Sequence, residues 1–480
     1  MIAKVGSFMA RRKPGFDWYV DSVHGDDSYS GKSSARPLKT IAGVLGQPIR
    51  SGQQIGLAAG SSWREQLIIP TANVTVAAYG AGPKPLLDCS EAIAAGAWAK
   101  TPVQTSVYQS NVPLDWDIGK TFVSVWEDGA RLVRATSVAN CDATPGSYFP
   151  SAENTSPITL YVHAADHSNP SSNGKLYEYS RRRHGLDPSA HPGCTFRGIW
   201  TRRNAHQDGS LLCADRNYDC LATEGSYHNI YLGPGCYLEN VEALDAYWPM
   251  GGRGTLVVYN ANVGNGENPT FKNCWFHCTA YNPQMDATGG HVNVSGQFGT
   301  LTYDNCRADN CYIGFGGANV AAFVVTGGSS RGCHRAITPV GIFTCTDFSA
   351  INTIYHGIET QAACASTTIR SFTCNVTGGW SCAGVYIGAN NSSLDLESSN
   401  IAGGGVFGVY NSANGVQFKA RNNTIACDGY FWYMATAPVA FDSDYNTFAN
   451  QGGKHMNLGG TDYTLAEYKA ATGQDQHSTP

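Results

Sequence analysis

Carboxylates, histidines and aromatic rings are concentrated in one stretch of the sequence, from Gly198 to Asn305. A Trp or Tyr ring can stack on a sugar face, while sugar hydroxyls need fixed polar partners. This combination of residue types predicts a groove for a glycan chain. The residues that supply it are His206, Asp208, Asp215, Asp219, Glu224, His228, Asp245, Tyr247, Trp248, Arg253, Trp275, His277, Tyr281, Asp286 and His291. The predicted substrate contacts are Tyr247, Trp248, Arg253, His277, Asp286 and Arg335.

Five polar residues follow a repeated three-residue motif (an apolar residue, a polar residue, then Asn, Gly, Ser or Ala) at similar distances. Counted from the motif's third residue, Asp245 stands at five, His277 at four, Asp309 at four, His334 at seven and His356 at six. If each motif begins one coil, these side chains stack near one line. Asp245 and Asp309 would then lie two coils apart, on the order of 9 to 10 Å. This is close to the upper limit for an inverting glycosidase, in which one Asp protonates the leaving oxygen and the other activates water.

A lyase would use the same line of side chains differently. It needs a cation beside a uronate carboxylate and a base that removes the neighbouring proton. Candidates are Arg253, Arg307, His334, Arg335 and His356. The predicted catalytic set for either chemistry is Asp245, Asp309, His334 and His356. No cofactor is expected, except Ca²⁺ in the lyase case with Asp286 or Asp309 as ligands.

Each candidate also has a structural interpretation. An Asp in a solenoid turn commonly bonds its own backbone, which applies to Asp245 and Asp309. A lone His such as His334 or His356 is often a hydrogen-bonded polar residue without a catalytic role. Tyr247 and Trp248 form packing contacts for a loop in the same interpretation. The sequence leaves both possibilities open.

The elements that position these residues come from the repeat itself. Its copies are Phe196-Arg197-Gly198, Leu238-Glu239-Asn240, Phe271-Lys272-Asn273, Tyr303-Asp304-Asn305, Val325-Thr326-Gly327, Phe348-Ser349-Ala350, Ile369-Arg370-Ser371, Leu396-Glu397-Ser398, Phe418-Lys419-Ala420 and Phe441-Asp442-Ser443. Successive third positions differ by 42, 33, 32, 22, 23, 21, 27, 22 and 23 residues. This predicts an all-β, right-handed parallel β-helix with three strands per coil of about 22 residues, with longer loops in the first three steps.

The ends and an interruption complete the predicted domain organisation. Residues 1–53 form an N-terminal segment with a short capping helix that ends at about Leu45, and 54–90 form the first coils. Three strands are expected at the start of these coils, at Gln54–Ala58, Gln66–Ile69 and Val74–Ala78, separated by Gly60-Ser61-Ser62 and Pro70-Thr71-Ala72. The pattern lapses over 91–183, which predicts a β-rich insertion. The main helix follows at 184–451, and 452–480 is a capping tail. Thr464 and Glu467 have the spacing of a helix capping box in that tail.

The opening segment resembles the start of pectate-lyase-like β-helix proteins. The matching residues are Tyr19-Val20-Asp21, Gly25-Asp26-Asp27, Ser30-Gly31-Lys32, Pro37-Leu38-Lys39-Thr40-Ile41 and Trp63-Arg64-Glu65. The match covers about seventy residues and is specific to the superfamily, not to one activity. The tail resembles the terminus of the same proteins, and phage tailspikes resemble the chain in fold. This resemblance implies surface polysaccharide as ligand and homotrimers as assembly.

Composition excludes other classes. The net charge is −5 and the longest basic run is Arg181-Arg182-Arg183, so we expect no nucleic acid partner. No apolar stretch reaches the roughly 18 residues of a membrane span, and Met1 to Pro14 lacks the features of a signal peptide. The sixteen cysteines are scattered and contain no CxxC pair, which favours buried thiols over zinc ligands.

Two classes of function fit this sequence. The first is a glycan-binding, tailspike-like protein of a phage particle that depolymerises a bacterial surface polysaccharide by hydrolysis or β-elimination. The second is a non-catalytic virion structural, fibre or decoration protein. A bacterial polysaccharide lyase or glycoside hydrolase is a further alternative. The expected location is the virion or otherwise the extracellular space, with other virion proteins as possible partners.

Overall fold

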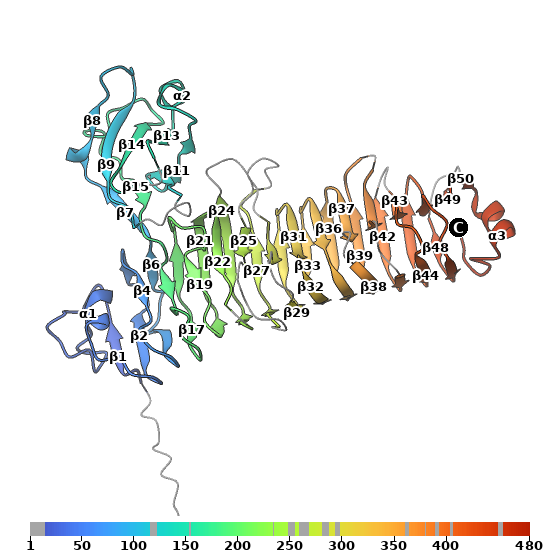
Figure 1. The fold of residues 1–480 in the computed structure, drawn as a ribbon, viewed down its shortest axis with the longest axis horizontal. Coiled ribbons are helices and arrows are strands. Elements are labelled where there is room, and N and C mark those ends of the chain that lie inside the picture. Colours follow the sequence, from blue (N-terminus) through green and yellow to red (C-terminus); the bar gives the residue numbers. More distant parts are fainter. Residues whose placement is uncertain are drawn as a thin grey trace, which may run out of the picture.

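The chain is an elongated parallel β-solenoid of about 14 turns, with an insertion that projects from its side near the N-terminal coils (Figure 1). The computed structural model describes residues 15–115, 122–152, 155–233, 235–247, 255–258, 268–280, 288–292, 298–360, 364–379, 381–388, 393–403, 407–449 and 455–480. The predicted fold class is confirmed. Among the described residues no helix has the length and apolar character to cross a membrane.

Three parallel walls form the solenoid, and each coil contributes one strand to each wall. Sheet 1 has fourteen strands, from β1 (Trp18–Val20) and β2 (Gln54–Ala58) to β47 (Ala440–Asp444). Sheet 2 has thirteen, from β3 (Ser62–Trp63) to β48 (Thr447–Phe448). Sheet 3 begins as five strands: β4 (Leu67–Ile68), β16 (Leu186–Asp187), β19 (Leu211–Leu212), β22 (His228–Tyr231) and β25 (Thr255–Val258).

Sheet 3 continues beside β25 as a nine-stranded wall. Its strands are β28 (Gly290–Val292), β31 (Ile313–Gly317), β34 (Arg335–Thr338), β37 (His356–Thr360), β40 (Ala383–Ile387), β43 (Phe407–Asn411), β46 (Trp432–Met434), β49 (Met456–Leu458) and β50 (Thr461–Tyr463). Only the last pair, β49 and β50, is antiparallel. Inward side chains from all three walls form one continuous core.

The capping helices lie where the sequence predicts them. Helix α1 (Ile41–Leu45) is capped by Thr40, whose hydroxyl accepts from the Gly43 N–H at 2.8 Å. Helix α3 (Leu465–Thr472) has the expected capping box and ends at Gly473 with φ of 69°. Figure 1 shows α3 at the end of the solenoid opposite the insertion. Both helices supply buried apolar side chains to the core.

The repeat assignment needs two corrections. From β5 (Thr75–Tyr79) onward, a residue with positive φ directly follows each strand of sheet 1, because the chain turns there in the left-handed region. Asp219 has φ of 54°, so the 42-residue step holds two coils, and β20 (Arg216–Tyr218) was missed. In three later copies the corner residues are Asp347, Asn422 and Tyr445, not Ala350, Ala420 and Ser443. Apolar-polar triplets recur on both sides of a corner, which explains the shifts.

The first coil also differs from its expected strands. The sequence indicated three strands at Gln54–Ala58, Gln66–Ile69 and Val74–Ala78. The third of these overlaps β5 (Thr75–Tyr79), which already belongs to the next coil on sheet 1. The missing wall is the two-residue strand β3, which follows the Gly60-Ser61 turn that looked like a separator. Strands this short give no periodic signal.

The insertion leaves the solenoid between β6 (Leu86–Asp88) of sheet 2 and β16 of sheet 3. Strands β7 (Ser90–Ile93) and β15 (Tyr177–Ser180) pair with each other at its base. Its strands form two sheets and enclose a separate hydrophobic core. Its elements are β7, β8 (Ala99–Lys100), β9 (Tyr108–Val112), β10 (Val125–Glu127), β11 (Ala130–Arg131), β12 (Val133–Arg134), α2 (Val138–Ala143), β13 (Ser147–Pro150), β14 (Ile158–His163) and β15.

All sixteen cysteines are buried and none forms a disulfide, as the scattered spacing indicated. Burial raises the pKa of the Cys220 and Cys364 thiols to about 11, and that of Cys427 to about 12. The thiolate is the reactive form, so both access and ionisation are suppressed. We expect a colorimetric thiol reagent at pH 8 to label none of them in the native protein and all sixteen after unfolding in urea. Rapid labelling of several thiols without urea would contradict this core.

Candidate functional site

One edge of the solenoid collects the features most suited to ligand binding. It is the corner at which the chain passes from sheet 2 to sheet 3. The insertion leaves the solenoid at this corner, between β6 and β16. Farther along the same corner the residues directly before β31, β34 and β37 are Tyr312, His334 and Tyr355. Insertion and aromatic residues therefore follow one edge.

Aromatic rings stack from this edge onto the outer face of sheet 3 over six successive coils. Tyr312 lies 4.8 Å from His334, and His334 lies 5.1 Å from Tyr355, between ring centroids. The series continues through His356, which lies 4.9 Å from Tyr386. Tyr386 to Tyr410 and Tyr410 to Tyr433 measure 5.2 and 5.0 Å, with planes within 8°. We call these rings the aromatic ladder: Tyr312, His334, Tyr355, His356, Tyr386, Tyr410 and Tyr433.

Strand register explains the ladder. Tyr386, Tyr410 and Tyr433 occupy the same position in β40, β43 and β46, so parallel pairing places them directly above one another. Their neighbours along each strand point inward; Val385 and Ile387, for example, are fully buried. The tyrosines therefore point outward and repeat at the coil spacing of about 4.8 Å.

The ladder borders a cleft of about 590 Å³, a size within the usual range of ligand sites. It is lined by Arg335, Tyr355, His356, Glu359, Ser381, Tyr386, Phe407, Tyr410, Tyr430 and Tyr433. Arg335 and Glu359 are its charged lining residues, and they form an ion pair with each other. Arg335 also donates to the Tyr312 hydroxyl at 2.5 Å and lies against the Tyr312 and Tyr355 rings. The lining is thus aromatic, hydroxyl-rich and close to neutral.

His356 has a structural explanation within the ladder. Burial, reinforced by Arg335, lowers the pKa of His356 to about 3. Its Nδ1 accepts the Ala383 backbone N–H at 3.1 Å, so the neutral ring carries its proton on Nε2. Neutral His356 is therefore a ring of the ladder, and its Nδ1, which already accepts a hydrogen bond, is not available to act as a base.

The depressed pKa has a consequence for stability. Below about pH 6.5 the unfolded chain protonates this imidazole while the folded chain does not, so the free energy of unfolding falls as the pH drops from 6.5 toward 3. We expect His356→Asn, whose amide oxygen replaces the Nδ1 acceptor, to weaken this dependence. Urea unfolding at pH 4.5 and 7.5 measures it. An imidazole NMR signal of His356 that titrates near pH 6.5 would contradict the assignment.

The predicted residues on sheet 2 lie apart from the cleft lining. Asp245, in β24 (Glu242–Tyr247), accepts from the Thr279 N–H at 2.8 Å and its hydroxyl at 2.6 Å. His277, in β27 (Trp275–His277), contacts Glu242 at 2.8 Å. Register places Asp309, in β30 (Arg307–Asp309), beside His277 and two coils from the strand of Asp245. The two aspartates therefore lie on strands two coils apart, as the sequence indicated.

Asp309 has the least complete set of hydrogen bonds among these groups. Its Oδ2 accepts from Trp275 Nε1 at 2.9 Å and from Arg307 at 2.6 Å. Its Oδ1 is buried without a hydrogen-bond partner. Buried polar atoms without partners are uncommon and call for an explanation. Asp309 thus keeps its place among the catalytic candidates.

Three charged residues occupy an unusual backbone position at the same edge. Arg203, Glu224 and Asp245 directly follow paired positions in β18 (Trp200–Arg202), β21 (Leu221–Ser226) and β24, with φ of 59°, 55° and 50°. In later coils the equivalent residues are Asn310, Gly332 and Asn352, which tolerate positive φ well. The charged residues face the insertion. The residue type at this position therefore differs between the coils that the insertion covers and the later coils that it does not cover.

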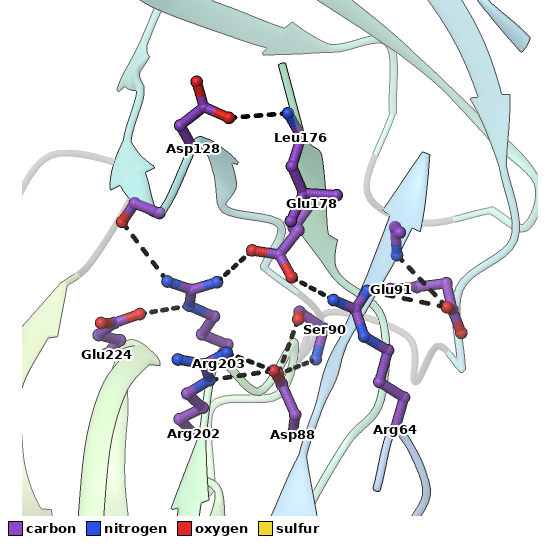
Figure 2. Close-up of polar contacts among 12 residues, drawn as sticks. Arg64, Asp88, Ser90, Glu91, Asp128, Leu176, Glu178, Arg202, Arg203 and Glu224 are labelled. Atoms are coloured by element: carbon purple, nitrogen blue, oxygen red, sulfur yellow. Dashed lines mark hydrogen bonds and ion pairs between the residues drawn. The ribbon is translucent and has the colours of Figure 1, made fainter. Parts of the chain in front are cut away.

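The insertion is fixed to the solenoid by buried ion pairs, which Figure 2 shows. Glu178 of β15 accepts from Arg203 at 2.6 Å and from Arg64, and Arg203 also donates to Glu224. Asp88 accepts from Arg202 at 2.7 Å. Arg203 and Glu178 are almost completely buried. The network holds the insertion in one orientation above the edge.

Other predicted contacts are distributed as follows. Tyr247 is buried, with the Arg131 guanidinium of the insertion 4.6 Å from its ring. Arg335 lines the cleft, and His334 belongs to the ladder. Trp248, Arg253 and Asp286 lie outside the described residues.

A possible metal cluster of His184, His206 and Asp208 lies near the insertion, with one ligand atom from each within 4.8 Å of the others. His206 Nδ1 accepts the Asp208 backbone N–H at 3.2 Å, and His184 Nδ1 lies 2.9 Å from the Gly209 carbonyl oxygen. These contacts give both imidazole rings a structural role as hydrogen-bonding groups.

Sequence reasoning missed the centre of the cleft. Tyr386, Tyr410 and Tyr433 follow one another at 24 and 23 residues, which matches the repeat, so a periodic signal was present. The predicted site residues lie mainly between Gly198 and Asn305, where the loops are long, whereas these tyrosines lie in the later, shorter coils. Glu359 and Phe407 had no comparable signal.

Comparisons with known proteins support the architecture. No family model matches the sequence, and the search of curated proteins found no match. The chain is similar to the solved structure of XylC with xylose, with a TM-score of 0.55 and 10% identity, over 92% of this chain and 85% of that chain. A glycoside hydrolase aligns at TM-score 0.41 and 10% identity, over 94% and 98%. The tailspike protein gp49 from Pseudomonas phage LKA1 aligns at 0.24 and 12%, over 85% and 72%. At such identities the first likeness shows the fold alone.

Proposed function

We propose that the chain binds an extended glycan along the helix axis, in the cleft beside the aromatic ladder. The observation that supports this most strongly is the ordered stack of Tyr386, Tyr410 and Tyr433, one ring per coil, in a cleft of about 590 Å³. An extended glycan repeats its sugar rings at an interval close to the coil spacing of about 4.8 Å. Each coil can therefore offer the same contact to each successive sugar.

The chemistry of the lining fits a sugar chain. Because the tyrosines stack on one another, they present ring edges and hydroxyls to the cleft, and the oxygens of sugar hydroxyls complement both of these. Tyr386 and Ser412 hydroxyls already form a 3.1 Å pair, which shows how the wall orders its donors and acceptors. Preordered polar groups reduce the entropy lost on binding.

The resemblance of the sequence to pectate-lyase-like β-helix proteins, and to phage tailspikes in fold, supports a source for this glycan. We propose a bacterial surface polysaccharide as ligand and a phage particle, tailspike-like, as the protein's location, with an extracellular location as the alternative. The homotrimer and contacts with other virion proteins belong to the same proposal. Sedimentation analysis tests the trimer directly, since a monomer at micromolar concentration would exclude it.

Depolymerisation is a second candidate function. Two observations favour it: the unpartnered buried Oδ1 of Asp309, and the positive-φ carboxylates Glu224 and Asp245 on adjacent coils beneath the insertion. Paired carboxylates are what glycoside hydrolysis needs. In the cleft, by contrast, Glu359 pairs with Arg335, so the cleft itself is better suited to holding the chain.

A polysaccharide panel tests both functions. The protein is incubated with capsule, O-antigen and pectin-like polysaccharides, and binding is read by affinity electrophoresis. Reducing ends and absorbance of unsaturated uronates are read in the same samples. Retardation by at least one polymer supports the proposal, and no retardation across a wide panel overturns it. Reducing ends that form without the absorbance of unsaturated uronates, and that are lost in Asp245→Asn and Asp309→Asn, would assign hydrolysis to those residues.

A further inference from the structure

Three side chains that can bind a metal ion meet where the insertion rejoins the solenoid. His184 stands two residues before β16, in the segment that returns from β15 of the insertion. His206 and Asp208 lie in the connection from β18 to β19, which is the same corner on the next coil. Among the described residues, this is the one group of three His, Cys, Asp or Glu side chains close enough to share an ion.

The hydrogen bond of His184 leaves a lone pair for a metal. Its Nδ1 lies 2.9 Å from the Gly209 carbonyl oxygen, which can only accept, so Nδ1 carries the proton and Nε2 the lone pair. Metal-binding histidines usually donate their other N–H to a carbonyl or carboxylate in this way. Gly209 has φ of 93°, and a Cβ there would lie 2.7 Å from the Asn229 carbonyl oxygen, so the loop that places this acceptor requires glycine.

His206 and Asp208 already have the spacing of two ligands of one ion. His206 Nδ1 lies 3.3 Å from Asp208 Oδ2. Two atoms about 2.0–2.1 Å from a tetrahedral ion are separated by about 3.3–3.4 Å. The Asp208 backbone N–H donates to the same Nδ1 at 3.2 Å, and an ion on Nδ1 replaces this bond. Since one ligand atom from each of the three residues lies within 4.8 Å of the others, small side-chain movements close the site.

Ligand type and burial define the ion. Two imidazoles and one carboxylate favour a divalent transition metal such as Zn²⁺, because Ca²⁺ and Mg²⁺ prefer oxygen ligands. His184 and His206 are buried, whereas the Asp208 side chain is 22% exposed. The ion can therefore enter from the side of Asp208, where a water can complete the tetrahedron.

We propose that His184, His206 and Asp208 bind one divalent transition metal ion of the Zn²⁺ type, which clamps the returning end of the insertion to the next coil. The ion joins His184 to the connection between β18 and β19. It acts together with the buried ion pair of Glu178 and Arg203, which fixes the same insertion. This site goes beyond the proposed glycan binding and does not depend on it.

Metal titration of the tag-free, full-length chain tests the proposal, with three variants. Asp208→Asn keeps the backbone N–H and the size of the side chain but removes the charged ligand. His184→Gln removes one imidazole. His477→Gln is the matched control, because His477 and Asp444 form a surface His–Asp pair, 2.7 Å apart, without a third ligand among the described residues.

Co²⁺ is titrated at pH 7.5 because it reports its geometry and ligands by absorption, and Zn²⁺ then displaces it. We expect one equivalent to bind with the visible absorption of tetrahedral Co²⁺ and without the near-ultraviolet absorption of a Co²⁺–thiolate bond. Asp208→Asn and His184→Gln should each weaken binding by about 10-fold or more, with His477→Gln unchanged. Circular dichroism checks that each variant is folded, and the partly exposed Asp208 decides the matter if His184→Gln does not fold.

Hydrogen exchange tests the clamp itself. The Gly185 and Leu186 amides donate to the Ser210 carbonyl oxygen, which joins the returning segment to the next coil. Both should exchange more slowly with Zn²⁺ in the wild type and at an unchanged rate in Asp208→Asn. Absence of stoichiometric binding, equal affinity of Asp208→Asn and wild type, thiolate absorption, or exchange that Zn²⁺ does not slow would overturn the proposal.

Discussion

Replacement of Tyr410 and Tyr433 together by leucine is expected to raise the dissociation constant for the bound glycan about 10- to 100-fold. Leucine keeps an apolar side chain on β43 and β46 but removes two rings and two hydroxyls from the cleft. A well-placed aromatic contact contributes about 0.5–1.5 kcal/mol, and two contacts account for the expected factor. Calorimetric titration with the polymer that the panel identifies measures it.

The controls separate the contribution of the rings from that of the hydroxyls. Tyr410→Phe with Tyr433→Phe keeps both rings and should retain most of the affinity, with a smaller loss for the hydroxyls. Tyr218→Leu alters a tyrosine of sheet 1 that stands 6.0 Å from Tyr237 and should leave binding unchanged. If the leucine pair binds as the wild type does, the ladder is structural and the glycan lies elsewhere.

Glu178→Gln should have the largest effect on stability, a loss of about 3–5 kcal/mol in the free energy of unfolding. Glu178 is almost completely buried and accepts from Arg203 and Arg64 together. The neutral amide leaves both guanidiniums without their shared carboxylate at the base of the insertion. Urea unfolding followed by circular dichroism gives the magnitude, and hydrogen exchange in β7 and β15 shows where protection is lost.

A surface ion pair provides the comparison for that variant. Lys419 and Asp395 lie 3.8 Å apart on the outer face of sheet 1, with the Lys419 side chain about half exposed. Lys419→Met should therefore cost about 0–1 kcal/mol. A Glu178→Gln variant no less stable than Lys419→Met would show that the junction does not depend on its buried charges.

The sequence predicts the parts of the fold that obey local rules. The Thr464–Glu467 capping box identifies the C-terminal end helix because capping uses residues three positions apart. The repeat identifies the solenoid because each coil turns at a positive-φ residue. The same rule failed at Asp219, since its coil begins with Asn217 at the inward position, where the motif expects an apolar residue.

The candidate site was harder to predict because it depends on register. Glu359 and Arg335 lie 24 residues apart, and their contact depends on the pairing of β34 with β37, which places Arg335 opposite His356, three residues before Glu359. The junction network joins Arg202 to Asp88 across 114 residues, and no local pattern connects them. Asp309 was identified as a candidate from its place in the repeat, but its unpartnered oxygen is a property of packing alone.

The most direct test of glycan binding along the edge is a crystal structure with a bound oligosaccharide of the polymer that the panel identifies. We expect consecutive sugar rings to run parallel to the helix axis, about one per coil, from Tyr355 to Tyr433. A chain that crosses the coils at a steep angle, or that lies on the outer face of sheet 1 with the cleft vacant, would contradict the account.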